Sequence, residues 1–120
     1  MIILHVIDII VFLKHEITGF IMDIDIYEIE KEIMSLDNIK LQKLISWLPH
    51  SDIAIAVLLF SQECGNKMLL NTSSKGEEIV KSEMEKYKET FESHIGEVVV
   101  KIKKYINLIV AGKGLEHIEE

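Results

Sequence analysis

Histidine and carboxylate side chains carry the widest range of chemistry in this sequence, because they exchange protons and bind metal ions. The five histidines stand at positions 5, 15, 50, 94 and 117. Their spacing gives none of the i, i+4 or short-loop pairs that metal sites use. Glu77 and Glu78 are adjacent, but a helix would hold both on a solvated face, whereas catalytic carboxylates work in a cleft. The sequence therefore predicts no catalytic residue, no metal site and no cofactor.

One arrangement would overturn this prediction, namely a pocket lined by His50 or His94 with carboxylates nearby, and no spacing indicates it. Cys64 is the only cysteine, which excludes an intramolecular disulfide and a thiolate metal cluster. Its position between Gln62 and Met68 predicts a small buried side chain on a helix.

Composition and charge are those of a small acidic globular domain. The 120 residues are 48% apolar and 28% charged, which predicts one folded domain and not a disordered chain. The formal net charge is −7, and all 13 cationic residues are lysines. A nucleic-acid binder needs a basic face, and bidentate recognition of phosphate or carboxylate relies on arginine. We therefore expect neither a nucleic acid nor a small-molecule substrate as partner.

Residues 1–26 are interpreted as an apolar N-terminal extension and residues 27–120 as a helical domain. The apolar run at 2–13 contains two polar residues and is shorter than the roughly twenty residues that span a bilayer. Charged residues follow it, where a secretory signal has small ones. A buried strand or helix is favoured over contact with a membrane surface. Met22 as the true first residue stays an alternative.

Apolar spacing predicts short helices through the rest of the chain. Residues 28–35 are charged with apolar residues at helical spacing, and Asp37 follows as an N-cap candidate. The next helix carries an apolar stripe at Leu41, Leu44, Ile45 and Leu48. Pro49 ends that helix, and Ser51 is predicted to cap the following one. Residues 53–60 begin by alternating isoleucine with alanine, a pattern compatible with either a strand or a buried helix.

The C-terminal half contains further helix patterns. Residues 61–71 are predicted as one helix, and Ser74 with Glu77 forms a capping box for the next. The inner face of that helix is expected to hold Val80, Met84, Tyr87 and Phe91. In the last helix a charged face, which includes Lys101 and Lys103, lies opposite an apolar face, and a glycine ends it. The predicted fold is all-α, a compact bundle of about six short helices.

Four segments together resemble the C-terminal domain of FliG, the rotor protein of the bacterial flagellar switch. They are Leu36-Asp37-Asn38, Gln42, Asp52-Ile53-Ala54-Ile55-Ala56-Val57 and Asn71-Thr72-Ser73-Ser74-Lys75. The similarity runs without a gap over residues 27–84 and more loosely to residue 118. In that family the domain is all-helical, armadillo-like and not an enzyme. The resemblance therefore implies a helix at residues 53–60.

The resemblance also implies a partner-binding site on one charged helix. In the family, the helix after the Asn-Met-Ser turn meets the cytoplasmic loop of the membrane stator. The domain docks on the switch-ring proteins, at the cytoplasmic face of the flagellar basal body and close to the membrane. Lys75 takes the position of the family's arginine, and Ser82 and Glu83 take that of its acidic pair. The implied partner-binding residues are Lys75, Glu78, Ser82 and Glu83.

Two functions are compatible with this pattern. The first is a rotor component that presents the charged helix to the stator. The second is a helical adaptor outside the motor, because Leu58 stands where the family has a lysine and Phe91 where it has an arginine. In the adaptor, Leu58, Leu59 and Phe60 would form an apolar docking surface, although burial of these residues in the core is the simpler account.

Overall fold

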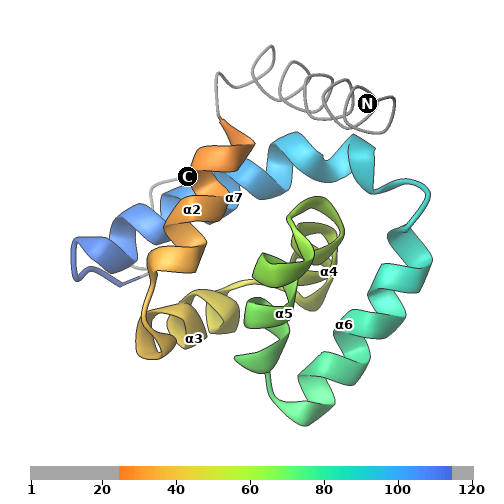
Figure 1. Cartoon of the computed structure of the whole chain (residues 1–120), viewed down its shortest axis with the longest axis horizontal. Coiled ribbons are helices and arrows are strands. Elements are labelled where there is room, and N and C mark those ends of the chain that lie inside the picture. The colour runs from red at the N-terminus through yellow and green to blue at the C-terminus, as the bar shows by residue number, and fades with distance from the viewer. Residues whose placement is uncertain (1–24, 115–120) are drawn as a thin grey trace, which may run out of the picture.

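Six α-helices and one short 3-10 helix make up residues 25–114, the part of the chain that the computed structural model describes. They are α2 (Ile26–Ser35), α3 (Asn38–Trp47), α4 (His50–Leu59), α5 (Gln62–Leu70), α6 (Ser74–Tyr87), η1 (Phe91–His94) and α7 (Ile95–Val110). No strand occurs among the described residues, which confirms the predicted all-α fold (Figure 1). The predictions for the apolar run at 2–13, for Met22 and for the histidines at 5, 15 and 117 fall outside the described residues.

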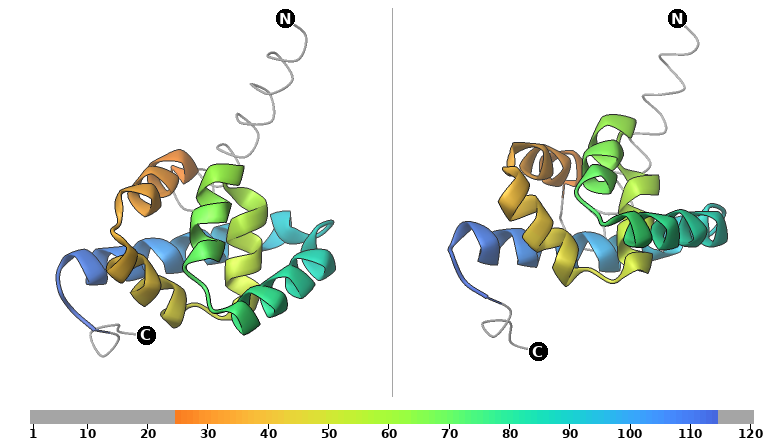
Figure 2. Two further views of the ribbon diagram at one scale, coloured as in Figure 1. Left: turned by 60° about the horizontal axis from the view of Figure 1, so that its bottom comes forward. Right: turned by 90° about the horizontal axis from the view of Figure 1, so that it is seen from below.

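The helix α4 lies at the centre of the molecule and packs against α5, α6 and α7. The helix α7 runs behind α2, α3 and α4, whereas α6 lies at one edge (Figures 1 and 2). Residues 53–56 of α4 are all buried. A helix buried on every side has no amphipathic period, which is why the pattern at 53–60 did not separate a strand from a helix.

Two predicted helix caps are each wrong by one or two residues. The helix α4 begins at His50 after Pro49, whose carbonyl accepts hydrogen bonds from the amides of Asp52 and Ile53 at 3.0 and 3.1 Å. Ser51 therefore lies inside the helix, because proline already has a φ suited to its start. The cap of α6 is Ser73 and not its neighbour, since the Ser73 Oγ accepts from the Gly76 amide at 3.0 Å.

The predicted ends of the last two helices agree better with the structure. The helix α6 ends at Tyr87, as expected, but Phe91 does not lie on it. Phe91 begins η1 and packs partly buried against the core. Gly112 adopts a φ of 74°, the left-handed conformation that commonly ends a helix.

The charged side chains of α7 are less solvated than the sequence indicates. Lys101 Nζ lies 2.6 Å from Asp52 Oδ2 on α4, and Lys103 Nζ lies 2.6 Å from Glu32 Oε1 on α2. The expectation that both lysines lie opposite the apolar face of this helix is therefore wrong. They flank the apolar stripe of α7, and their long side chains reach carboxylates on neighbouring helices.

Side chains on α2 and α5 satisfy the ends of each other's helices. Glu30 Oε1 accepts a hydrogen bond from the Ser61 amide, the N-cap residue of α5, at 2.6 Å. Lys67 Nζ donates to the carbonyls of Met34 and Leu36, at the C-terminal end of α2, at 2.6 and 2.9 Å. Unpaired carbonyls at a helix end are well suited to a cation. These contacts hold α2 against α5.

Cys64 is completely buried, as predicted, and burial raises the pKa of its thiol to about 12, with the Glu30 carboxylate adding to the rise. Only the thiolate reacts readily with disulfide reagents. We expect Cys64 of the folded domain to react at pH 8 at least about 100-fold more slowly than in urea-unfolded protein. The rate of thiol titration with Ellman's reagent measures this difference. Equal rates would mean that α5 opens readily.

Candidate functional site

The helix α6 has 14 residues, and it is held to the domain along one side. Gly76 and Val80 are buried in its contact with α4. A Cβ at Gly76 would come within 2.9 Å of Thr72 Cγ2 and 3.0 Å of Ser73 Oγ, so glycine allows the first turn to pack closely. The opposite side of α6 is left open to solvent.

Three of the four predicted partner-binding residues lie on that open side. Lys75, Glu78 and Ser82 are exposed. Their spacing of i, i+3 and i+7 places them on one stripe of the helix. We call these three residues the α6 stripe. The structure thus brings together three residues that the sequence singled out, on a surface that a partner can reach.

The fourth residue, Glu83, lies at the border between the stripe and the contact with α4. The residue is partly buried, and its Oε2 atom is buried without a hydrogen-bond partner among the described residues. Leaving a buried acceptor unsatisfied typically costs about 1–3 kcal/mol, and more for a charged group.

The comparisons with known proteins decide the family. The family model named FliG C-terminal domain matches residues 25–111, well over half of the chain. The chain belongs to the FliG C-terminal domain family. Neither the search of curated proteins nor the search of solved structures finds a match. The chain therefore carries a domain of the flagellar motor switch type, and this family consists of structural motor components.

Membership of the FliG C-terminal domain family agrees with the helical architecture and with the segments that carried the resemblance. The match begins at Asp25, the N-cap of α2, and ends at Ala111, the C-cap of α7. The family domain thus coincides with the described helices. None of the helices between residues 25 and 114 has the length and apolar character needed to cross a membrane.

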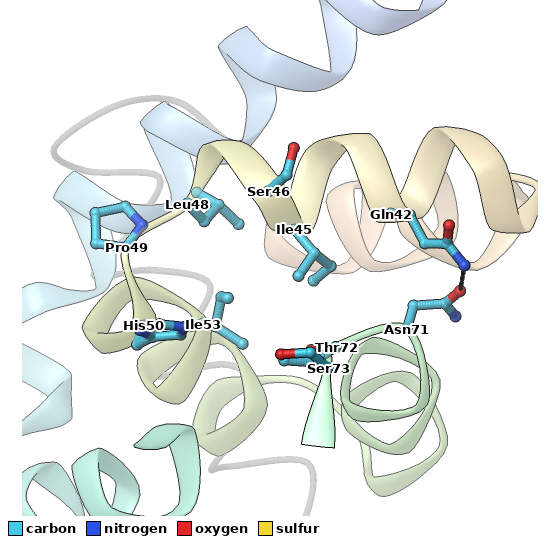
Figure 3. Close-up of a pocket in the computed structure, with 10 residues that line it drawn as sticks. All are labelled: Gln42, Ile45, Ser46, Leu48, Pro49, His50, Ile53, Asn71, Thr72 and Ser73. Carbon is cyan, nitrogen blue, oxygen red and sulfur yellow. Dashed lines mark hydrogen bonds between the residues drawn. The ribbon is translucent and has the colours of Figure 1, made fainter. Parts of the chain in front are cut away.

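A shallow groove of about 370 Å³ lies between α3, the start of α4 and the turn before α6 (Figure 3). It is lined by Gln42, Ile45, Ser46, Leu48, Pro49, His50, Ile53, Asn71, Thr72 and Ser73. At one end Gln42 Nε2 donates to Asn71 Oδ1 at 3.3 Å (Figure 3). None of these lining residues carries a carboxylate, so His50 meets no acid–base partner in the groove. His94 packs edge-on against Tyr87 instead.

The apolar surface required by the adaptor hypothesis is not present. Leu59 and Phe60 are each only 6% exposed and belong to the core, and Leu58 is partly buried. The alternative that the sequence left open, burial of these residues, is confirmed for Leu59 and Phe60. Leu59 ends α4 and Phe60 caps it, and α4 packs against α5, α6 and α7. Among the described residues, no cluster of His, Cys, Asp or Glu could hold a metal ion.

The exposed apolar side chains lie elsewhere, and sequence reasoning missed them. Ile39 is 80% exposed and Leu70 is 83% exposed. Ile39 lies in the first turn of α3, and Leu70 is the last residue of α5. At 100° per residue, Ile39 lies about 160° from the buried Leu41 in α3, and Leu70 lies about 160° from the buried Met68 in α5. The helical period therefore places both residues off the buried faces of their helices.

Proposed function

We propose that this domain is a component of the flagellar rotor and that α6 is its docking surface for the cytoplasmic loop of the stator. Family membership supports a role in the motor switch. The observation that carries the proposal is the surface of α6, which presents Lys75, Glu78 and Ser82 on one exposed stripe. The same helix carries the partly buried Glu83, whose Oε2 atom has no hydrogen-bond partner in the described residues.

This surface suits contacts that form and break repeatedly. Exposed ion pairs contribute roughly 0.2–1 kcal/mol each, because water and salt screen them. A stator loop with both signs of charge could pair with Lys75 and with Glu83 at the same time. Docking of the same domain on switch-ring proteins would place it at the cytoplasmic face of the basal body. The rotor role then needs no chemistry in the domain itself.

Reversing the charge of Lys75 or Glu83 is expected to impair motility. In a strain that lacks this gene, wild type should restore swimming, whereas Lys75→Glu and Glu83→Lys should each fail or restore it poorly. We expect binding of a stator-loop peptide to weaken by roughly 3- to 10-fold for each reversal, from the loss of one pair and the repulsion that replaces it. Swimming in soft agar and fluorescence anisotropy measure the two effects.

Lys104→Glu is the matched control, because Lys104 is an exposed lysine of α7, a helix that does not carry the stripe. It should restore swimming as wild type does. Normal swimming of the deletion strain would contradict the rotor role. A peptide affinity that does not fall when salt rises from 0.1 to 0.5 M would contradict docking through charges.

A further inference from the structure

The central helix α4 is unusual because apolar burial cannot determine how it is oriented about its own axis. Residues 53–56 are four successive buried residues, and at 100° per residue they cover almost the whole circumference. Burial of apolar surface is non-directional. An amphipathic helix has one rotation that hides its apolar face, whereas α4 hides apolar side chains at many rotations. Close packing of large and small side chains, together with a directional contact, selects one of them.

Asp52 supplies such a contact. It is the only charged residue among the described positions that is classed as buried, and it lies in the first turn of α4. Its Oδ2 atom lies 2.6 Å from Lys101 Nζ on α7, with the two side chains 13% and 32% exposed. A charged hydrogen bond of this length holds the first turn of α4 next to α7. A polar contact between side chains that are surrounded by apolar ones is also a known means of fixing the register of helices.

The position of α4 is passed on to α6. The helix α6 makes its most extensive contact with α4, through Gly76 and Val80. His50, the first residue of α4, brings its Nε2 within 3.4 Å of where a Gly76 Cβ would lie. The two helices therefore meet closely at their first turns. A rotation or slip of α4 would carry the α6 stripe with it.

We propose that the Asp52–Lys101 pair is a positioning contact, which sets the rotation and axial position of α4 and so the orientation of α6 relative to α7. The consequence for stator docking rests on the proposed function, whereas the positioning itself does not. The pair determines native geometry in addition to stability. A role in stability alone would leave the distance between α6 and α7 in the folded molecules unchanged.

Spin labels at Ser82→Cys on α6 and Asn107→Cys on α7 test the proposal by pulsed electron paramagnetic resonance. Both positions are exposed, whereas Cys64 is buried and is expected to react slowly with the label. In this background Lys101→Met should shift the most probable distance by about 1.5 Å or more, the rise of one helical residue, or clearly broaden the distribution. An unchanged distribution in folded Lys101→Met protein would overturn the proposal.

Lys103→Met is the matched control, because it breaks a second 2.6 Å ion pair of α7 that leads to α2 and not to α4. It should leave the α6–α7 distance unchanged. An equal shift in both variants would also overturn the proposal, since it would indicate general loosening of α7. If Lys101→Met protein does not fold, Asp52→Asn replaces it, which keeps the side-chain shape and removes the charge. An unchanged distribution in that variant counts equally against the proposal.

The distance measurement needs no partner, so it separates this inference from the proposed function. A shifted distance together with normal swimming of the deletion strain would retain the positioning role and refute the rotor role. An unshifted distance together with lost swimming in the Lys75→Glu strain would refute the positioning role and support the rotor role.

Discussion

Replacement of Ile102 by alanine is expected to lower the free energy of unfolding by about 3–4 kcal/mol. Ile102 lies at the middle of α7, is fully buried, and belongs to the helix that packs against α2, α3 and α4. The substitution removes three methyl or methylene groups and leaves a cavity between helices that are held from several sides. Because small domains have stabilities of about 5–15 kcal/mol, the loss is a large fraction of the total.

Urea denaturation followed by circular dichroism at 222 nm measures this loss. Val110→Ala is the matched control, since Val110 is an apolar residue of the same helix that is 64% exposed. It should change the free energy of unfolding by no more than about 0.5 kcal/mol. Equal losses for the two variants would mean that the middle of α7 does not form the core.

Replacement of Lys101 by methionine is expected to cost about 2 kcal/mol of stability at neutral pH. Breaking a fully buried ion pair costs about 3–5 kcal/mol, because the remaining charge stays buried without a partner. The Lys101–Asp52 pair is partly exposed, so solvent reduces the effect. Lys104→Met, a change to an exposed lysine of the same helix, should cost less than about 0.5 kcal/mol.

The stability difference between wild type and Lys101→Met should depend on pH in one direction. The hydrogen bond to Asp52 raises the pKa of Lys101 above its ordinary value of 10.5. Protonated Lys101 therefore favours the folded state, and its contribution is fully present below pH 10.5. The contribution should decline as the pH rises from there through the raised pKa, because the unfolded chain loses the proton first.

Urea titrations of both proteins at pH 7, 9 and 11 give the difference at each pH. It should be equal at pH 7 and 9 and smaller at pH 11. The Cys64 thiol also ionises in the unfolded chain above pH 9, but both proteins contain it, so its effect cancels in the difference. A difference that stays constant to pH 11 would show that the charge of Lys101 does not carry the stabilisation.

Sequence reasoning located most helices because their period is a local property. The stripe on α3 and the apolar face of α7 each follow from one-sided burial, and both helices appear where the spacing places them. The predicted N-cap of α6 differs from the observed one by one residue, and the reason is again local. Ser73 and Ser74 can both accept an amide hydrogen bond, and the choice depends on which backbone is extended.

In the candidate site, too, some features follow from local spacing and others depend on tertiary packing. Spacing alone puts Lys75, Glu78 and Ser82 on one side of a helix, and the structure leaves that side exposed. The buried Oε2 of Glu83 could not be foreseen, because burial of a single atom depends on tertiary packing around α6. Burial of Leu59 and Phe60 also required the structure, since α4 packs against α6 and α7, which come later in the chain.

The sequence by itself determined the all-α class, most of the helix positions, the buried cysteine and the resemblance that the family match confirmed. Each of these depends on residue type and on spacing within about one helix. Only the tertiary structure decided that Lys101 and Lys103 pair with Asp52 and Glu32, positions 49 and 71 residues away along the chain. Contacts over such separations depend on how the helices cross, and a helical period specifies a buried face but not the helix that covers it.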